Sequence, residues 1–64
     1  MDTRSTAAHR LLRLHEVADR LSVSTSMAWK LVAYGHLPSV RIGRAVRVRP
    51  TDLEAYLESA VREG

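Results

Sequence analysis

A chain of 64 residues has room for one small domain, and because it contains no cysteine, neither a disulfide nor a thiolate-bound metal can stabilise it. It lacks an apolar run of membrane-spanning length and the apolar core of a signal peptide, so we expect a soluble, cytoplasmic protein. The net charge of +3 is polarised, since residues 37–50 hold four arginines and no acid, whereas residues 51–64 hold four acids and one arginine. Such a footprint is typical of nucleic-acid binding, although a solvated, arginine-rich hairpin would have the same composition.

Residues 1–10 have neither helical nor strand periodicity and are rich in serine, threonine and alanine, which predicts a flexible tail. We place the domain at residues 11–64. Its first apolar run contains Leu11, Leu12 and Leu14. This run is either a brief strand that pairs with a later hairpin or a lead-in that packs Leu14 under the first helix.

A first helix follows, with one apolar face formed by Val17, Ala18 and Leu21. Its start is weakly capped, because Arg13 stands where a serine or threonine would be the preferred cap. We expect the helix to end near Leu21 or Ser22.

A second helix is predicted after a short break. Val23 is an isolated apolar residue that can fill the angle between the two helices, and Ser24 is a preferred N-cap. The inward face of this helix would carry Ala28, Leu31 and Val32. Gly35 can adopt a left-handed conformation at little cost and should end it. The two helices and their turn have the spacing of a helix-turn-helix.

The outward face of the second helix combines short hydroxyls near the N-terminus, one cation and one flat aromatic ring, which suits a DNA groove and its phosphates. It comprises Thr25, Ser26, Trp29, Lys30 and Ala33. For Trp29 we expect a mixed role, half packed and half at the interface. The alternative is a small bundle in which this polar face is merely solvated.

Alternating apolar and charged residues predict a β-hairpin with its reversal at Gly43-Arg44-Ala45. We expect the apolar set to face the core; it comprises Val40, Ile42, Val46 and Val48. The arginines of the alternation, Arg41, Arg47 and Arg49, would then face solvent. Because an isolated hairpin is marginally stable, it should lean on the helices as a wing, with its tip on the side of the second helix.

The last helix has a strong start, since Pro50 lies just before Thr51 and Glu54, which have the spacing of a capping box. Its apolar stripe should close the core with Leu53, Tyr56, Leu57 and Ala60. Its other face is acidic and should point away from any phosphate backbone. The expected fold is α+β, mostly α: a small winged helix-turn-helix made of two helices, a β-hairpin wing and a C-terminal helix.

The spacing of polar residues indicates no catalytic or metal site. His9, His15 and His36 do not share a helical turn, so we interpret them as surface residues rather than metal ligands. No glycine-rich phosphate loop, paired-carboxylate pattern or catalytic triad is evident, and so small a domain offers little volume for a substrate cleft. We therefore expect no enzyme activity, no metal, no cofactor and no small-molecule substrate.

Three ordered blocks of the sequence resemble the small excisionase-type winged helix-turn-helix family, which is related to the DNA-binding domain of MerR-type regulators. The blocks read VADRLSVSTSMAWKLVAYGHLP (17–38), VRIGRAVRV (40–48) and DLEAYL (52–57). Members are phage, plasmid or integrative-element proteins that bind DNA without catalysis. Many steer an integrase toward excision by binding repeated sites and bending the DNA, and others regulate transcription. The resemblance implies a bacterial or phage-encoded protein associated with the nucleoid.

The resemblance also assigns DNA-contacting residues. In the major groove or on its flanking phosphates it places Ser24, Thr25, Ser26, Trp29 and Lys30, and on the wing Arg41, Arg44 and Arg47. Arg44 would lie nearest the minor groove. Ser22 replaces a usual glycine, Arg13 a usual hydroxyl cap and Thr25 a frequent arginine. We therefore expect a slightly strained turn, a late start of the first helix, and modest base specificity with more selection by DNA shape.

These observations lead to three hypotheses. The first is a recombination directionality factor that binds and bends attachment-site DNA to promote integrase-mediated excision. The second is a small transcription regulator with the same fold, and the third is a protein-interaction module whose basic face meets an acidic partner. The expected partners are double-stranded DNA, an integrase, and neighbouring copies of the same chain, because a domain this small buries little DNA surface alone. No membrane partner is expected.

Overall fold

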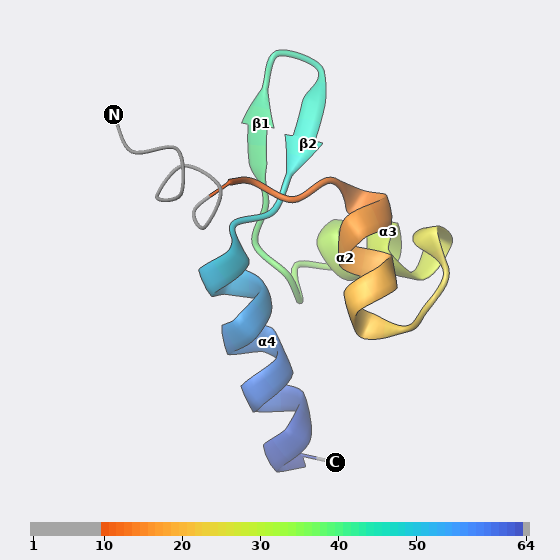
Figure 1. The fold of residues 1–64 in the computed structure, drawn as a ribbon, viewed down its shortest axis with the longest axis vertical. Coiled ribbons are helices and arrows are strands. Elements are labelled where there is room, and N and C mark those ends of the chain that lie inside the picture. Colours follow the sequence, from red (N-terminus) through yellow and green to blue (C-terminus); the bar gives the residue numbers. More distant parts are fainter. Residues whose placement is uncertain (1–9, 64) are drawn as a thin grey trace.

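The computed structural model describes residues 10–63. Within that range it contains three helices and a two-stranded antiparallel hairpin, which lies between the second and third helices (Figure 1). The elements in chain order are α2 (Leu14–Leu21), α3 (Thr25–Ala33), β1 (Val40–Ile42), β2 (Ala45–Arg47) and α4 (Pro50–Glu63). The predicted winged helix-turn-helix fold of the α+β class is confirmed. The predicted tail at residues 1–10 lies, apart from Arg10, outside the described residues.

One small core joins all of these elements except β1. Its buried members are Leu12, Leu14, Val17, Ala18, Ala28, Leu31, Leu37, Val46, Val48 and Leu53. Leu21, Val32 and Tyr56 pack against it from the edge. The inward faces predicted for the two helices of the helix-turn-helix are therefore the faces that the fold buries.

The helix α2 begins at Leu14, earlier than the late start expected from its poor cap. Arg13 occupies the N-cap with an extended backbone, and its N–H donates to Glu16 Oε1 at 2.7 Å. A carboxylate three residues into a helix can satisfy the N-cap amide in this way. This hydrogen bond is also the main reason why the pKa of Glu16 is lowered. The cap of α2 is thus supplied by Glu16 rather than by a hydroxyl.

The turn after α2 has the left-handed residue that the sequence predicted to be strained. Ser22 has φ 58° and ψ 42°, and it is the one non-glycine residue between 10 and 63 with a positive φ. The N–H groups of Ser22 and Val23 donate to the carbonyls of Asp19 and Ala18 at 3.2 and 3.0 Å, which is the pattern of a Schellman motif. Val23 is 38% exposed, so the prediction that it fills the angle between the helices is wrong.

Both predicted caps of α3 are confirmed. Ser24 Oγ accepts a hydrogen bond from the N–H of Met27 at 3.1 Å. At the other end Gly35 has φ 81°, and the N–H groups of Gly35 and His36 donate to the carbonyls of Val32 and Leu31. The helix is therefore defined by its sequence at both ends.

The hairpin has a register one residue away from the predicted one. The reversal is the two-residue loop Gly43-Arg44 instead of three residues, and the pairs are Val40 with Arg47, Arg41 with Val46, and Ile42 with Ala45. Because paired residues share a face of the sheet, Val40 and Ile42 of β1 lie on one face and Val46 of β2 lies on the other. Val46 is buried, whereas Ile42 is 56% exposed, so the prediction that Ile42 faces the core is wrong.

The glycine of this loop accounts for the shift. Gly43 has φ 61°, and its neighbour Arg44 does not have a positive φ, which is the pattern of a type II′ turn with glycine in its first central position. A two-residue turn of this type matches the twist of paired strands. It is therefore favoured over the three-residue reversal that would align all apolar residues.

The segment before α2 pairs with the residue that follows β2. Leu12 and Val48 form an antiparallel bridge in which each N–H donates to the other carbonyl, at 2.8 and 2.9 Å. Leu14 is buried at the start of α2. Both readings of the first apolar run are therefore correct, one for Leu12 and the other for Leu14.

The helix α4 starts one residue before the predicted capping box. Pro50 is its first residue, and the N–H groups of Asp52 and Leu53 donate to the carbonyl of Arg49. Thr51 is thus inside the helix and cannot be its N-cap. Leu53 is buried, but Leu57 is 37% exposed, because the C-terminal half of α4 projects from the body of the fold (Figure 1). Only the first part of the predicted stripe closes the core.

Candidate nucleic-acid interface

The helix α3 presents a polar face opposite its buried residues. All five predicted recognition residues are exposed: Ser24, Thr25, Ser26, Trp29 and Lys30. Ala28 and Leu31 are buried on the other side of the helix. Trp29 is 47% exposed, which matches the half-packed position predicted for its ring. The structure therefore brings the predicted helix residues onto one accessible surface.

The N-terminus of α3 is suited to an anion. Its first turn contains no acidic residue, so no carboxylate there offsets the partial positive charge of the helix dipole. Ser24 Oγ already accepts from Met27, which leaves its hydroxyl hydrogen free to donate. Ser24 is thus first a helix cap, and any contact with a phosphate comes in addition to that role.

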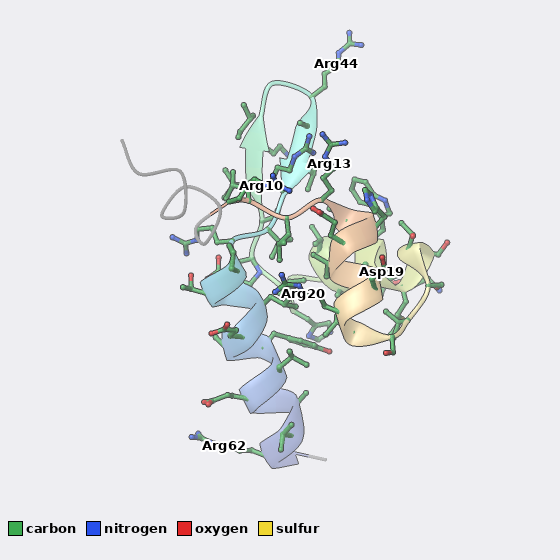
Figure 2. The ribbon with its side chains drawn as sticks, viewed as in Figure 1. Arg10, Arg13, Asp19, Arg20, Arg44 and Arg62 are labelled. Carbon is green, nitrogen blue, oxygen red and sulfur yellow. The ribbon has the colours of Figure 1, made fainter. Side chains whose placement is uncertain are left out.

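The three predicted wing arginines lie on one hairpin but not on one face. Arg41 shares a face with Val46, whereas Arg47 lies on the opposite face with Val40. Arg44 sits in the turn and extends away from the body of the molecule (Figure 2). Arg47 is half-buried and its Nη1 donates to the carbonyl of Val46 at 2.9 Å. The hairpin is therefore basic on both sides and at its tip.

Arg49, the last arginine of the basic segment, is neutralised by an acid. Its Nε and Nη2 donate to the two carboxylate oxygens of Asp52 at 2.7 and 3.1 Å. This contact raises the pKa of Arg49. The exposed acids Glu54 and Glu58 follow on α4. Negative charge thus begins where the hairpin ends, as the polarised sequence indicated.

Two further arginines join the basic surface. Figure 2 shows Arg10 and Arg13 near the hairpin, while Arg62 lies at the far end of α4. Sequence reasoning treated Arg13 only as a poor cap and Arg10 as part of the tail. Assigning Leu12 to a strand that pairs with the hairpin would have placed both arginines there, because they are close to Leu12 in sequence.

The described part of the chain contains neither a metal-binding cluster nor a membrane-spanning helix. Between residues 10 and 63, no group of three or more histidine, cysteine, aspartate or glutamate side chains is placed to hold a metal ion. In the same range no helix is both long and apolar enough to cross a membrane.

Comparison with known proteins gives a consistent picture. Residues 11–61 match the family described as a helix-turn-helix domain. Two curated proteins of Mycobacterium tuberculosis, from the strains CDC 1551 / Oshkosh and ATCC 25618 / H37Rv, are each 39% identical over 54 residues. The matches cover 84% of this chain and 69% of each relative, and both relatives carry the name "Putative DNA-binding protein". No solved structure matches the chain at a significant level.

Proposed function

Because the chain belongs to the helix-turn-helix domain family, we propose that it binds double-stranded DNA with α3 in the major groove and the hairpin at the adjacent minor groove. The observation that carries this proposal is the exposed polar face of α3 together with a basic hairpin, in a stretch that has no acid from residue 22 to residue 50. The name shared by the two mycobacterial relatives supports it.

The proposed contacts divide between positioning and reading. Arg44, at the tip of the wing, contacts phosphates and the negative potential of the minor groove, so it contributes affinity for many sequences. Thr25 and Lys30, on the exposed face of α3, lie where a helix in the major groove reaches base edges. The short side chain of Thr25 reads less than a bidentate arginine would, so base specificity is modest.

The experiment compares Arg44→Ala and Thr25→Ala on a matched site and a scrambled site over a salt series. Arg44→Ala should weaken binding to both sites and lower the salt slope by about 0.9, the value of one lost phosphate contact. Thr25→Ala should reduce the preference for the matched site, by about 1–3 kcal/mol if Thr25 contacts a base. Arg62→Ala is the matched control, because it removes the same charge at the far end of α4.

Two results would contradict this division of roles. One is a salt slope that Arg44→Ala leaves unchanged, and the other is a Thr25→Ala variant that loses equal affinity for both sites. If the unaltered protein shows no binding to any duplex at moderate salt, DNA binding itself is refuted. In that case the third hypothesis, an interaction module for an acidic protein, becomes the better one.

At a finer level we propose a recombination directionality factor, acting on DNA together with an integrase. A single domain of this size buries little DNA surface, so several copies should bind tandem sites cooperatively and bend them. The test is a mobility-shift titration on tandem attachment-site repeats, combined with a bending assay on circularly permuted fragments. Stepwise, independent shifts on unbent DNA would favour the alternative, a small transcription regulator with a single operator.

A further inference from the structure

An open groove of about 770 Å³ lies between the segment that precedes α2 and one face of the hairpin. Its lining includes three arginines, Arg10, Arg13 and Arg47, and two apolar residues, Leu11 and Ile42. These residues come from two segments far apart in the sequence, the stretch before α2 and the hairpin, and only Arg47 belongs to the predicted site. The groove is therefore a basic surface that neither the helix nor the wing tip explains.

The strand pairing builds this groove. Leu12 and Val48 are paired and buried, so the residues next to them in sequence, Arg13 and Arg47, lie on the opposite, outer face. The two-residue turn puts Ile42 on the face that also carries Arg47. Under the three-residue reversal expected from the sequence, Ile42 would have faced the core and the groove would have lost its apolar floor.

The groove has an excess of positive charge. Among the described residues, Arg10, Arg13 and Arg47 form no ion pair with a carboxylate. Glu16 is the one acid in the lining, and its Oε1 already accepts the N–H of Arg13. Three guanidinium groups against one carboxylate leave the groove with a net positive charge that favours an anion, and arginine binds phosphate through paired N–H donors.

We propose that this groove holds a backbone phosphate of the bound DNA, contacted by Arg13 and Arg47 and approached by Arg10, with the neighbouring deoxyribose packed on Ile42. Ile42 is an exposed apolar residue flanked by arginines, an arrangement that suits a sugar-phosphate segment better than a free anion. The position of the groove supports the same occupant, because Arg47 belongs both to the wing that we propose to contact DNA and to the lining of the groove. The inference rests on the proposed DNA binding and adds a third contact region to it.

The first test is the salt dependence of Arg13→Gln on duplex DNA. The helix cap uses the backbone N–H of Arg13, so this variant should keep its fold, as circular dichroism can verify. We expect the salt slope to fall by about 0.9, so that the affinity ratio of unaltered protein to variant is about 3.5-fold larger at 50 mM than at 200 mM salt. Arg13→Lys should restore the slope, and Arg62→Gln should leave it unchanged.

The second test identifies the phosphate. Neutral methylphosphonates replace single phosphates, one at a time, along the strand that flanks the minor groove occupied by the wing. At one position the replacement should weaken the unaltered protein clearly more than Arg13→Gln, because the variant has already lost one of the two arginine contacts to that phosphate. Equal weakening of both proteins at every position would overturn the proposal.

The outcomes separate this inference from the proposed function. If Arg13→Gln binds DNA with the slope of the unaltered protein, the groove does not face DNA and the inference fails alone. If the unaltered protein binds no duplex, both fail. Loss of slope in Arg13→Gln without a sensitive phosphate would also refute the specific contact, because it would indicate only a general loss of positive charge.

Discussion

Replacing Ser22 by glycine should stabilise the protein. Ser22 is the left-handed residue of the turn between α2 and α3, with φ 58° and ψ 42°. An L-amino acid in this conformation costs roughly 1–2 kcal/mol, because its Cβ approaches the following carbonyl. The Ser22 side chain is exposed and, within residues 10–63, makes no hydrogen bond that glycine would remove.

The gain is partly offset in the unfolded chain. Glycine has more conformational freedom to lose on folding, which costs about 0.5–1 kcal/mol. The net effect of Ser22→Gly is therefore a stabilisation of about 0.5–1 kcal/mol at a position with positive φ. For a domain of this size, that corresponds to an increase of about 2–8 °C in Tm.

The control is Ser22→Ala, which keeps the unfavourable Cβ and cannot relieve the strain. Thermal or urea unfolding followed by circular dichroism measures all three proteins. Ser22→Gly should be the most stable, about 1 kcal/mol above Ser22→Ala. If the alanine variant is as stable as the glycine variant, the turn does not carry the strain that its backbone angles indicate.

Two other substitutions test local features. Gly43→Ala should lower the free energy of unfolding by about 1–2 kcal/mol, because the residue has φ 61°. No atom lies within 4 Å of an added Cβ, so the whole penalty is conformational. In thermal unfolding the control Arg44→Ala should not share this loss, and equal thermal midpoints for the two variants would contradict the turn assignment. Glu16→Gln should remove one source of acid sensitivity. The hydrogen bond from Arg13 lowers the pKa of Glu16 below 4.5, so its stabilising effect is present above pH 4.5 and is lost as the pH falls through the folded-state value. Thermal midpoints of the unaltered protein should therefore fall more steeply with acid than those of Glu16→Gln, and parallel curves would contradict this.

Local patterns in the sequence predicted the helices, the caps at Ser24 and Gly35, and the place of the hairpin, because each depends on residues close together in the chain. They did not predict the hairpin register. A difference of one residue in the turn moves every side chain of one strand to the other face relative to its partner strand. The length of the turn, and with it the register, depended on the backbone of Gly43. Counting alternating residues could not resolve it.

The basic groove was missed for a different reason. Arg13 reaches the hairpin only because Leu12 pairs with Val48, and the sequence left open whether Leu12 belonged to a strand. Similarly, Leu57 has the helical spacing of a core residue, yet α4 extends beyond the body and leaves it exposed. Periodicity identifies a face of an element, but the tertiary arrangement decides what covers that face.

The bridge between Leu12 and Val48 also has a kinetic consequence. The two helices of the helix-turn-helix and the hairpin are each closed by contacts between near neighbours in the chain, which form rapidly. This bridge instead joins residues separated by both helices and the hairpin. On the ribosome Leu12 is synthesised long before Val48, so its backbone groups must stay paired with water until the second strand has emerged. The nascent protein therefore cannot complete its fold, and its N-terminal segment stays undocked, until the whole hairpin has been synthesised.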